Sequence, residues 1–316
     1  MSTNPLVSVL IPCHNAERWV AETLESVLAQ TYRPIEVIVV DDGSTDGSLE
    51  VLAGYGARGV KLMTQVNRGA AAARNLALSA ASGDLVQFLD ADDLLAQDKI
   101  ERQVTGLAGR TDAVAMAEWA RFHRDPNEAC FVPDSCWRTL DPVTWLVEAW
   151  SHGGGMLFPA MWLLPRRIVE IAGQWNECLT LADDTEYFTR VLLASCGVFF
   201  VSGARCYYRS GLPGSLSGSK TRAGWESQFL VLALCEAHLR RHEESERTRR
   251  ACAVVWQVLA HACYPYAPDI ANHALARARS LHALRTWPGG GPTFRWVSRM
   301  VGWKLARRLQ RLSGRP

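Results

Sequence analysis

Short apolar runs alternate with segments of helical periodicity through the first 110 residues. The runs are rich in β-branched residues and predict buried strands, whereas the spaced apolar positions between them predict amphipathic helices. The expected strands are 6–11, 35–40, 60–63 and 85–89, and the expected helices are 17–29, 69–81 and 99–107, with a further helix after 42–45 that Ser44 or Thr45 would cap. This alternation is typical of βαβ units, so we expect an α/β fold with a mostly parallel sheet covered by helices on both faces.

The pattern becomes mixed beyond residue 110 and then wholly helical beyond Thr221. Expected strands are 113–117, 161–164, 198–201 and 205–209; expected helices are 142–150, 166–172 and one from about 183 to 194. Helical periodicity after Thr221 is broken at 264–265 and 288–292. We therefore predict an α/β domain over 1–220 and a helical C-terminal extension over 221–316. The α/β domain would divide into halves of about 5–110 and 111–220.

Composition excludes some classes of protein. The net charge of +2 argues against a protein dominated by nucleic-acid binding. None of the nine cysteines forms a C-x-x-C pair, so we expect reduced, mostly buried thiols, for example Cys13, Cys196, Cys235 and Cys252, in a cytoplasmic protein. We see neither a secretory leader nor an apolar run of about 18 residues that would span a bilayer.

Carboxylates follow the strand expected at 85–89. Asp90 and Asp92 are two residues apart, so in an extended segment they would point the same way, with Asp93 next to them. Ligands of open α/β sheets bind outside the carboxyl ends of the strands, and paired carboxylates suit Mg²⁺ or Mn²⁺. The alternative is a polar turn, in which Asp is favoured without any metal.

Two further polar clusters lie at predicted strand and helix ends. Asp41 and Asp42 could accept hydrogen bonds from a nucleobase or ribose, or could cap the next helix. Asn67, Gly69 and Arg74 surround a helix start, where phosphate binds well, although a capped helix with a solvated Arg has the same pattern.

A second acidic centre, Asp183-Asp184, opens the helix expected near 183. One of these carboxylates could act as the general base that takes the proton of an attacking hydroxyl. Acids at a helix start are also favoured by the helix dipole alone.

Together these segments resemble the family 2 glycosyltransferases of GT-A fold. The matching blocks are VSVLIPCHN at 7–15, SVLAQT at 26–31, EVIVVDDGSTD at 36–46, NRG at 67–69 with ARN at 73–75, and GD at 83–84 leading to FLDADD at 88–93. The resemblance extends over about 5–215. It implies transfer of a sugar, with inversion, from a nucleoside diphosphate donor that is usually UDP-linked.

The resemblance also implies roles for individual residues. Asp184 occupies the position of the catalytic base, Asp92 that of the direct metal ligand, and Asp90 lies near the ribose and diphosphate. The donor-binding set is Pro12, Asn15, Glu17, Asp41, Asp42, Asn67, Gly69, Arg74, Asp90 and Ala91. Weaker acceptor or loop candidates are Asp183, Trp162, Arg209 and Ser215. Many relatives carry a His after the Tyr-Arg pair, where this chain has Ser210 and Gly211.

The last segment, 294–315, is basic with an apolar stripe. It predicts either an interfacial helix on anionic lipid near a lipid-linked acceptor, or an amphipathic helix packed on the protein. Trp296, Val297, Met300, Val301, Leu305, Leu309 and Leu312 form the stripe, and Arg299, Lys304, Arg307, Arg308 and Arg311 surround it.

We interpret the sequence as a metal-dependent inverting glycosyltransferase of cell-surface glycan synthesis, acting on a saccharide or lipid-linked acceptor and possessing no nucleic-acid partner. Two alternatives are a sugar nucleotidyltransferase and an inactive nucleotide-sugar-binding module. The first normally has a Gly-rich, basic loop after its first strand, where this chain has 12–17, and the second has no chemical need for both acidic centres.

Overall fold

The computed structural model describes residues 4–212, 220–282 and 291–312. Two compact units make up the chain. Unit 1 takes in the described residues of 1–145, 156–179 and 183–215, and unit 2 those of 146–155, 180–182 and 216–316. Ser215 lies outside the described residues.

Unit 1 is built on one mixed sheet of eight strands. Its strands are β1 (Val7–Cys13), β2 (Ile35–Asp42), β3 (Val60–Gln65), β4 (Leu85–Phe88), β5 (Leu94–Leu95), β6 (Val114–Phe122), β7 (Trp162–Pro165) and β8 (Val198–Arg209), in the order β3-β2-β1-β4-β7-β6-β8-β5. The four strands predicted in the first half run parallel, as expected, and β7 and β5 pair antiparallel with their neighbours. All residues of β1 and β4 are buried, which explains their continuous apolar runs.

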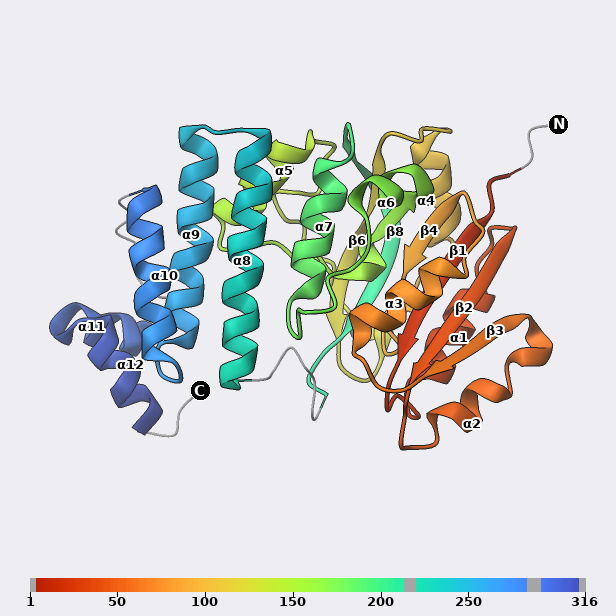
Figure 1. Ribbon diagram of the computed structural model, residues 1–316, viewed down its shortest axis with the longest axis horizontal. Coiled ribbons are helices and arrows are strands. Elements are labelled where there is room, and N and C mark those ends of the chain that lie inside the picture. The colour runs from red at the N-terminus through yellow and green to blue at the C-terminus, as the bar shows by residue number, and fades with distance from the viewer. Residues whose placement is uncertain (1–3, 213–219, 283–290, 313–316) are drawn as a thin grey trace. The chain divides into compact units, whose positions relative to one another are not determined.

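Helices surround this sheet. They are α1 (Val20–Leu28), α2 (Ser48–Ala53), α3 (Ala70–Ser79), α4 (Lys99–Leu107), α6 (Arg166–Ala172) and α7 (Asp183–Leu193), while α5 (Pro142–Ser151) crosses the boundary between the units. Beside Arg74 and Asn75, the buried residues of α3 are four alanines, Ala71, Ala72, Ala73 and Ala77. Their small side chains let α3 lie close against β1 and β2 (Figure 1).

Parallel pairing brings three polar turns to one edge of the sheet. In the register of β1 and β2, Cys13 pairs with Asp41, so the chain segments that leave these strands start side by side. On its other side, β1 pairs with β4, which leads into Asp90. The turns at 12–15, 41–44 and 90–93 therefore lie at the same edge of the sheet.

Some local predictions were wrong. The strands expected at 198–201 and 205–209 form one strand, β8, because Glu118 of β6 accepts hydrogen bonds from Ser202 and Gly203 and bridges the irregular register there. Helix α2 starts later than expected, after Gly47 and without a side-chain cap. All nine cysteines are free thiols, as expected. Cys196, which we expected to be buried, is exposed.

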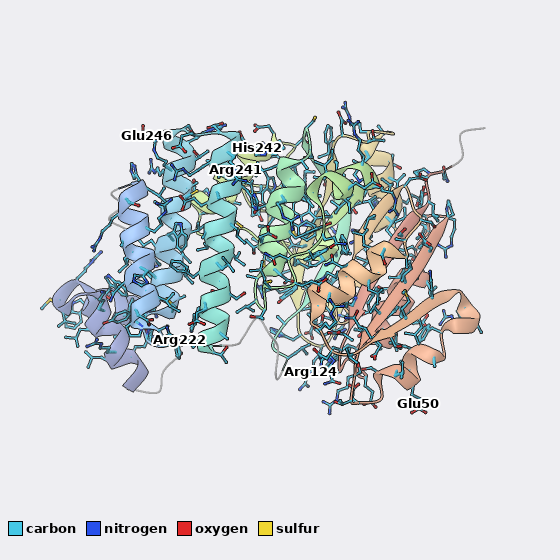
Figure 2. The ribbon with its side chains drawn as sticks, viewed as in Figure 1. Glu50, Arg124, Arg222, Arg241, His242 and Glu246 are labelled. Atoms are coloured by element: carbon cyan, nitrogen blue, oxygen red, sulfur yellow. The ribbon has the colours of Figure 1, made fainter. Side chains whose placement is uncertain are left out.

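The described helices of unit 2 are α8 (Arg222–His242), α9 (Glu246–Cys263), α10 (Pro268–Leu281), α11 (Pro292–Val301) and α12 (Trp303–Leu312). Figure 2 shows Arg222 at the first turn of α8 and Arg241 and His242 at its last. The basic tail, expected as one helix, forms two, because Gly302 adopts a φ of +80° between them. Among the described residues, no helix combines the length and apolarity that crossing a bilayer requires.

Candidate active site

The Asp90–Asp93 segment forms a tight turn rather than the extended segment we expected. The amide of Asp93 donates to the carbonyl of Asp90 at 3.2 Å, with Ala91 buried inside the turn. Asp93 is fully buried, and one of its carboxylate oxygens accepts the Arg209 amide at 2.9 Å. Asp93 thus anchors the turn, while Asp90 and Asp92 remain partly exposed.

Arg209 holds this turn from the other side. Its guanidinium donates to the carbonyl of Asp92 at 2.8 Å and to the carboxylate of Glu22 at 2.5 Å. It lies 4.5 Å from the ring of Trp19 and 4.4 Å from that of Phe122, which fix its plane. Because its side chain is only 1% exposed, Arg209 is a positioning residue for the turn.

Arg74 connects the two acidic centres. One terminal nitrogen donates to Asp90 at 2.7 Å and the other to Asp183 at 2.8 Å. The guanidinium stacks 4.3 Å from the ring of Trp175, which itself stacks on Tyr187 at 4.0 Å. The Arg74 side chain is 6% exposed, and although burial alone would lower its pKa, the charges of Asp90 and Asp183 raise it and keep the guanidinium charged. Residues far apart in the sequence therefore meet at one buried cation.

Asp184 lies beside this bridge at the start of α7. Its carboxylate accepts the Thr185 amide at 2.7 Å and is half-buried. Burial, and then the charge of Asp183, raise the pKa of Asp184 to about 7, although Arg74 opposes the rise. A carboxylate with a pKa near neutrality is suited to accept a proton from a hydroxyl.

Asp92 lies in the same turn, and its side chain is partly exposed. Burial and the neighbouring charge of Asp90 raise the pKa of Asp92 to about 6, although Arg209 opposes the rise. No group of three or more His, Cys, Asp or Glu side chains with metal-site geometry occurs in the part of the chain that the structure describes. Asp92 and Asp90 alone would leave most coordination positions of Mg²⁺ or Mn²⁺ to water and phosphate oxygens, which is the usual arrangement at phosphate sites.

Asp42 organises the neighbouring turn. One carboxylate oxygen accepts the Arg68 amide at 2.8 Å and the Gln65 side chain at 2.7 Å, and the other accepts the Gly69 amide at 2.8 Å. Asp42 is 2% exposed, so here it shapes the edge of the site, and a role in reading a nucleobase stays a prediction.

The predicted donor edge is held together by short polar contacts. Asn15 accepts the Thr45 amide at 2.8 Å, and Glu17 accepts the Gly47 amide at 3.1 Å. Pro12 is a buried residue of β1, and Asp41, also buried, accepts the Ser44 amide at 3.2 Å. These residues bring the turns after β1 and β2 into one surface.

Several residues at this site were missed from the sequence. His14 lies between the carbonyl of Asp42 and the side chain of Asn67, at 3.0 and 3.1 Å. Glu177 accepts from Asn75 at 3.0 Å and from Arg68 at 2.7 Å. His14 belongs to a motif block that pointed to it, whereas no local pattern marks Glu177.

One predicted acceptor residue is corrected. Trp162 is fully buried, and its ring stacks on Phe188 at 5.6 Å and meets Trp145 edge-on at 5.5 Å. An indole without exposed surface cannot stack on an acceptor, so Trp162 is a core residue.

Known proteins share this arrangement of motifs. Residues 8–168 match the family model described as glycosyl transferase family 2, which covers half of the chain. The chain belongs to this family. An uncharacterized glycosyltransferase of Haemophilus influenzae is 46% identical over 145 residues, which are 45% of this chain and 57% of that protein.

A second relative of this glycosyltransferase has a more specific name. It is the Escherichia coli protein UDP-Glc:alpha-D-GlcNAc-diphosphoundecaprenol beta-1,3-glucosyltransferase WfgD, 41% identical over 101 residues, or 32% of this chain and 40% of that protein. The glycosyltransferase thus spans roughly half the length of these two relatives.

Solved structures show that the fold is GT-A. S. aureus TarS 1–349 in complex with UDP-GlcNAc superposes with a TM-score of 0.61 at 18% identity, covering 98% of this chain and 92% of that one. The mannosyltransferase PcManGT of Pyrobaculum calidifontis, in complex with GDP-Man and Mn²⁺, gives a TM-score of 0.60 at 21% identity, covering 98% and 88%. The predicted family, fold and enzyme class are therefore confirmed, and the nucleotidyltransferase and inactive-module alternatives are set aside.

The Arg74 bridge predicts a large stability effect. Arg74→Met would leave Asp90 and Asp183 without their shared cation, so the free energy of unfolding should fall by about 3 kcal/mol. Urea denaturation measures this. Arg68→Met is the matched control: Arg68 is 59% exposed in its pair with Glu177, so its loss should cost less than about 1 kcal/mol. Equal effects of the two variants would show that the bridge does not stabilise unit 1.

Proposed function

We propose that this glycosyltransferase moves a sugar, with inversion, from a nucleoside diphosphate donor, most simply a UDP-sugar, to a hydroxyl of a saccharide or lipid-linked acceptor in cell-surface glycan synthesis. The observation that carries the proposal is the Arg74 bridge, because it joins the Asp90–Asp93 turn to the start of α7. A reaction with a leaving group and an incoming group needs both centres at one site. The name of the relative WfgD, a glucosyltransferase for a GlcNAc-diphosphoundecaprenol, supports a glycan product.

The proposed donor site follows the edge of the sheet. We assign the nucleotide to the surface made by Pro12, Asn15, Glu17, Asp41, Asp42, Asn67 and Gly69, and the diphosphate to Arg74, Asp90 and Ala91. Asp92 and Asp90 would hold Mg²⁺ or Mn²⁺. When bound, such a cation neutralises charge on the leaving diphosphate. Support for metal use comes from Mn²⁺ in the PcManGT complex.

Asp184 is the proposed catalytic base. As the acceptor hydroxyl attacks the anomeric carbon, its proton passes to the Asp184 carboxylate, and the bond to the diphosphate breaks on the opposite face of the sugar. A single displacement needs one base and no covalent intermediate, and it inverts the anomeric centre. Arg74 keeps Asp183 paired, so Asp184 is the carboxylate of the two that remains available.

Asp184→Asn should lower turnover by roughly 10²–10⁴-fold, because an amide cannot take the proton. In the wild-type enzyme kcat/KM should rise as pH passes upward through about 7, where Asp184 becomes charged, and this rise should vanish in the variant. Release of nucleoside diphosphate measures both. The control is Asp98→Asn, which changes a partly exposed carboxylate outside the site that pairs with Arg102. Turnover of Asp184→Asn near that of the control would refute the assignment of the base.

Donor binding has its own test. Thermal unfolding against UDP, GDP and other nucleoside diphosphates should show stabilisation by one of them that Mn²⁺ enlarges; at 100 times its Kd a ligand adds about 2.7 kcal/mol. Asp92→Ala should lose the Mn²⁺-dependent part, whereas Asp184→Asn should keep it. A Mn²⁺ effect unchanged in Asp92→Ala would remove Asp92 from the metal site.

We also propose that the basic tail of unit 2 contacts anionic lipid. This tail, 294–315, contains seven Lys and Arg residues and no acid. Helices α11 and α12 pack through Phe294, Trp303 and Ala306, while Trp296 and Met300 are 65% and 70% exposed. An exposed apolar surface among cationic side chains matches the interface of an anionic bilayer. The enzyme would then act as a peripheral protein on the inner face of the plasma membrane.

Vesicle co-sedimentation tests this contact. The chain should bind phosphatidylglycerol vesicles more tightly than phosphatidylcholine vesicles, and a chain truncated before Phe294 should lose the difference. Trp296→Ser with Met300→Ser should weaken binding by about tenfold or more, because two large apolar side chains no longer enter the interface. The exposed pair Leu49→Ser with Ile171→Ser is the control. Undiminished binding of the truncated chain would refute the contact.

A further inference from the structure

Helices α8, α9 and α10 line an open groove of about 870 Å³ within unit 2. Its apolar lining includes Phe229, whose ring meets the buried ring of Trp256 edge-on at 4.8 Å. Ala233 and Ala237 of α8 and Ala276 of α10 leave room between the helices because their side chains are small. The groove is therefore open to an apolar ligand of some length.

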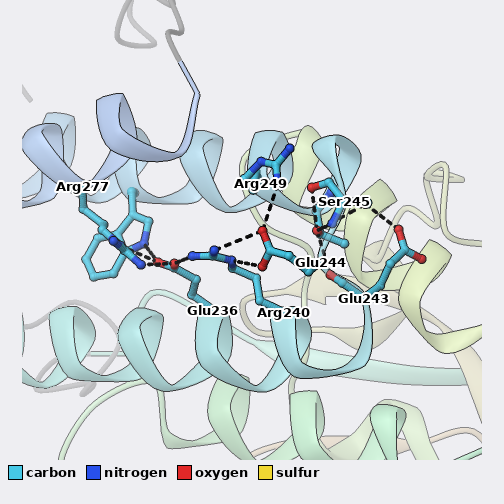
Figure 3. Close-up of polar contacts among 9 residues, drawn as sticks. Glu236, Arg240, Glu243, Glu244, Ser245, Arg249 and Arg277 are labelled. Atoms are coloured by element: carbon cyan, nitrogen blue, oxygen red, sulfur yellow. Dashed lines mark hydrogen bonds and ion pairs between the residues drawn. The ribbon is translucent and has the colours of Figure 1, made fainter.

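One end of the groove is cationic. Glu236, 4% exposed, accepts from Arg240 at 2.8 Å, from Arg277 through two nitrogens, and from the Trp256 indole at 2.8 Å (Figure 3). Burial alone would raise the pKa of Glu236, but the hydrogen bonds from Arg277, Arg240 and Trp256 lower it below the ordinary value. Glu236 is thus a fixed anion that orients two guanidinium groups along the groove.

Positive charge remains after this pairing. The lining carries three guanidinium groups, those of Arg240, Arg241 and Arg277, against the two carboxylates of Glu236 and Glu244. Glu244 is occupied by Arg240 at 2.7 Å and by Arg249 at 2.9 Å. Arg241 has no ion pair or hydrogen bond with any residue that the structure describes. It stands at the last turn of α8, where Figure 2 labels it.

The charged and apolar ends are separated along α8. Twelve residues from Phe229 to Arg241 correspond to about 18 Å of helix. A ligand with an anionic head and an apolar chain matches this order, because guanidinium groups bind phosphate through several hydrogen bonds and aromatic rings bury an apolar chain.

We propose that this groove binds a lipid phosphate, with its phosphate or diphosphate at Arg241 and Arg277 and its chain against Phe229 and the small alanine side chains of the groove. The proposal deepens the proposed function, since a lipid-linked acceptor belongs to this chemical class. The residues of this groove belong to unit 2, whereas the residues of the proposed donor site belong to unit 1.

Calorimetric titration of the full chain with farnesyl diphosphate, below its micelle concentration and in EDTA, tests the proposal. The Asp92→Ala background removes metal-dependent binding at the donor site. The double variant Arg241→Gln with Arg277→Gln should weaken binding by about tenfold or more. Arg250→Gln with Arg279→Gln, exposed arginines of α9 and α10 outside the groove, should leave binding unchanged.

Two further probes separate the head from the chain. Inorganic diphosphate and farnesol should each bind at least about tenfold more weakly than farnesyl diphosphate, because each occupies only one end of the groove. Equal binding by either probe, or equal losses in the two double variants, would overturn the proposal. If farnesyl diphosphate does not bind but a nucleoside diphosphate still stabilises the protein in a Mn²⁺-dependent way, the lipid site alone is refuted. If farnesyl diphosphate binds but no nucleoside diphosphate stabilises the protein, the donor site alone is refuted.

Discussion

A buried guanidinium that serves two carboxylates is the constraint on which the active site of this enzyme depends. The guanidinium of Arg74 is buried where it contacts Asp90 and Asp183. Burial of a charge costs desolvation free energy unless its partners are close and well oriented. Trp175 supplies the flat surface that holds the guanidinium plane, and Tyr187 supports Trp175. The two acidic centres are therefore positioned by one side chain, and neither can shift without the other.

The carboxylates of the site divide into three kinds according to the groups that contact them. Asp42 and Asp93 accept backbone amides and shape the two turns. Asp90 and Asp183 are paired with Arg74. Asp92 and Asp184 lack a cation of their own, and burial raises the pKa of each. This last kind contains the two residues that we propose as the direct metal ligand and as the base, because a carboxylate without a cation of its own is the most available to a metal ion or a proton.

Sequence patterns predicted the local structure well and the long-range contacts poorly. The bounds of α4 and α6 agree with their prediction because apolar periodicity and end signals coincide there. The four parallel strands follow from the same kind of pattern. No local pattern specifies that Arg74 meets Asp183, 109 residues away, or that Arg209 meets Glu22, 187 residues away. The break between α11 and α12 was not predicted, because the helical spacing of apolar residues continues on both sides of Gly302.

The alanine face of α3 has a consequence for how this enzyme can diverge. Because Ala71, Ala72 and Ala73 are so small, the helix lies deep against the sheet and carries the backbone of Arg74 down to the level of both carboxylates. A bulkier residue at any of the three would lift the helix and withdraw the guanidinium from its partners. This face of α3 therefore has almost no room for larger side chains, because its small residues set the depth at which the charge of Arg74 lies.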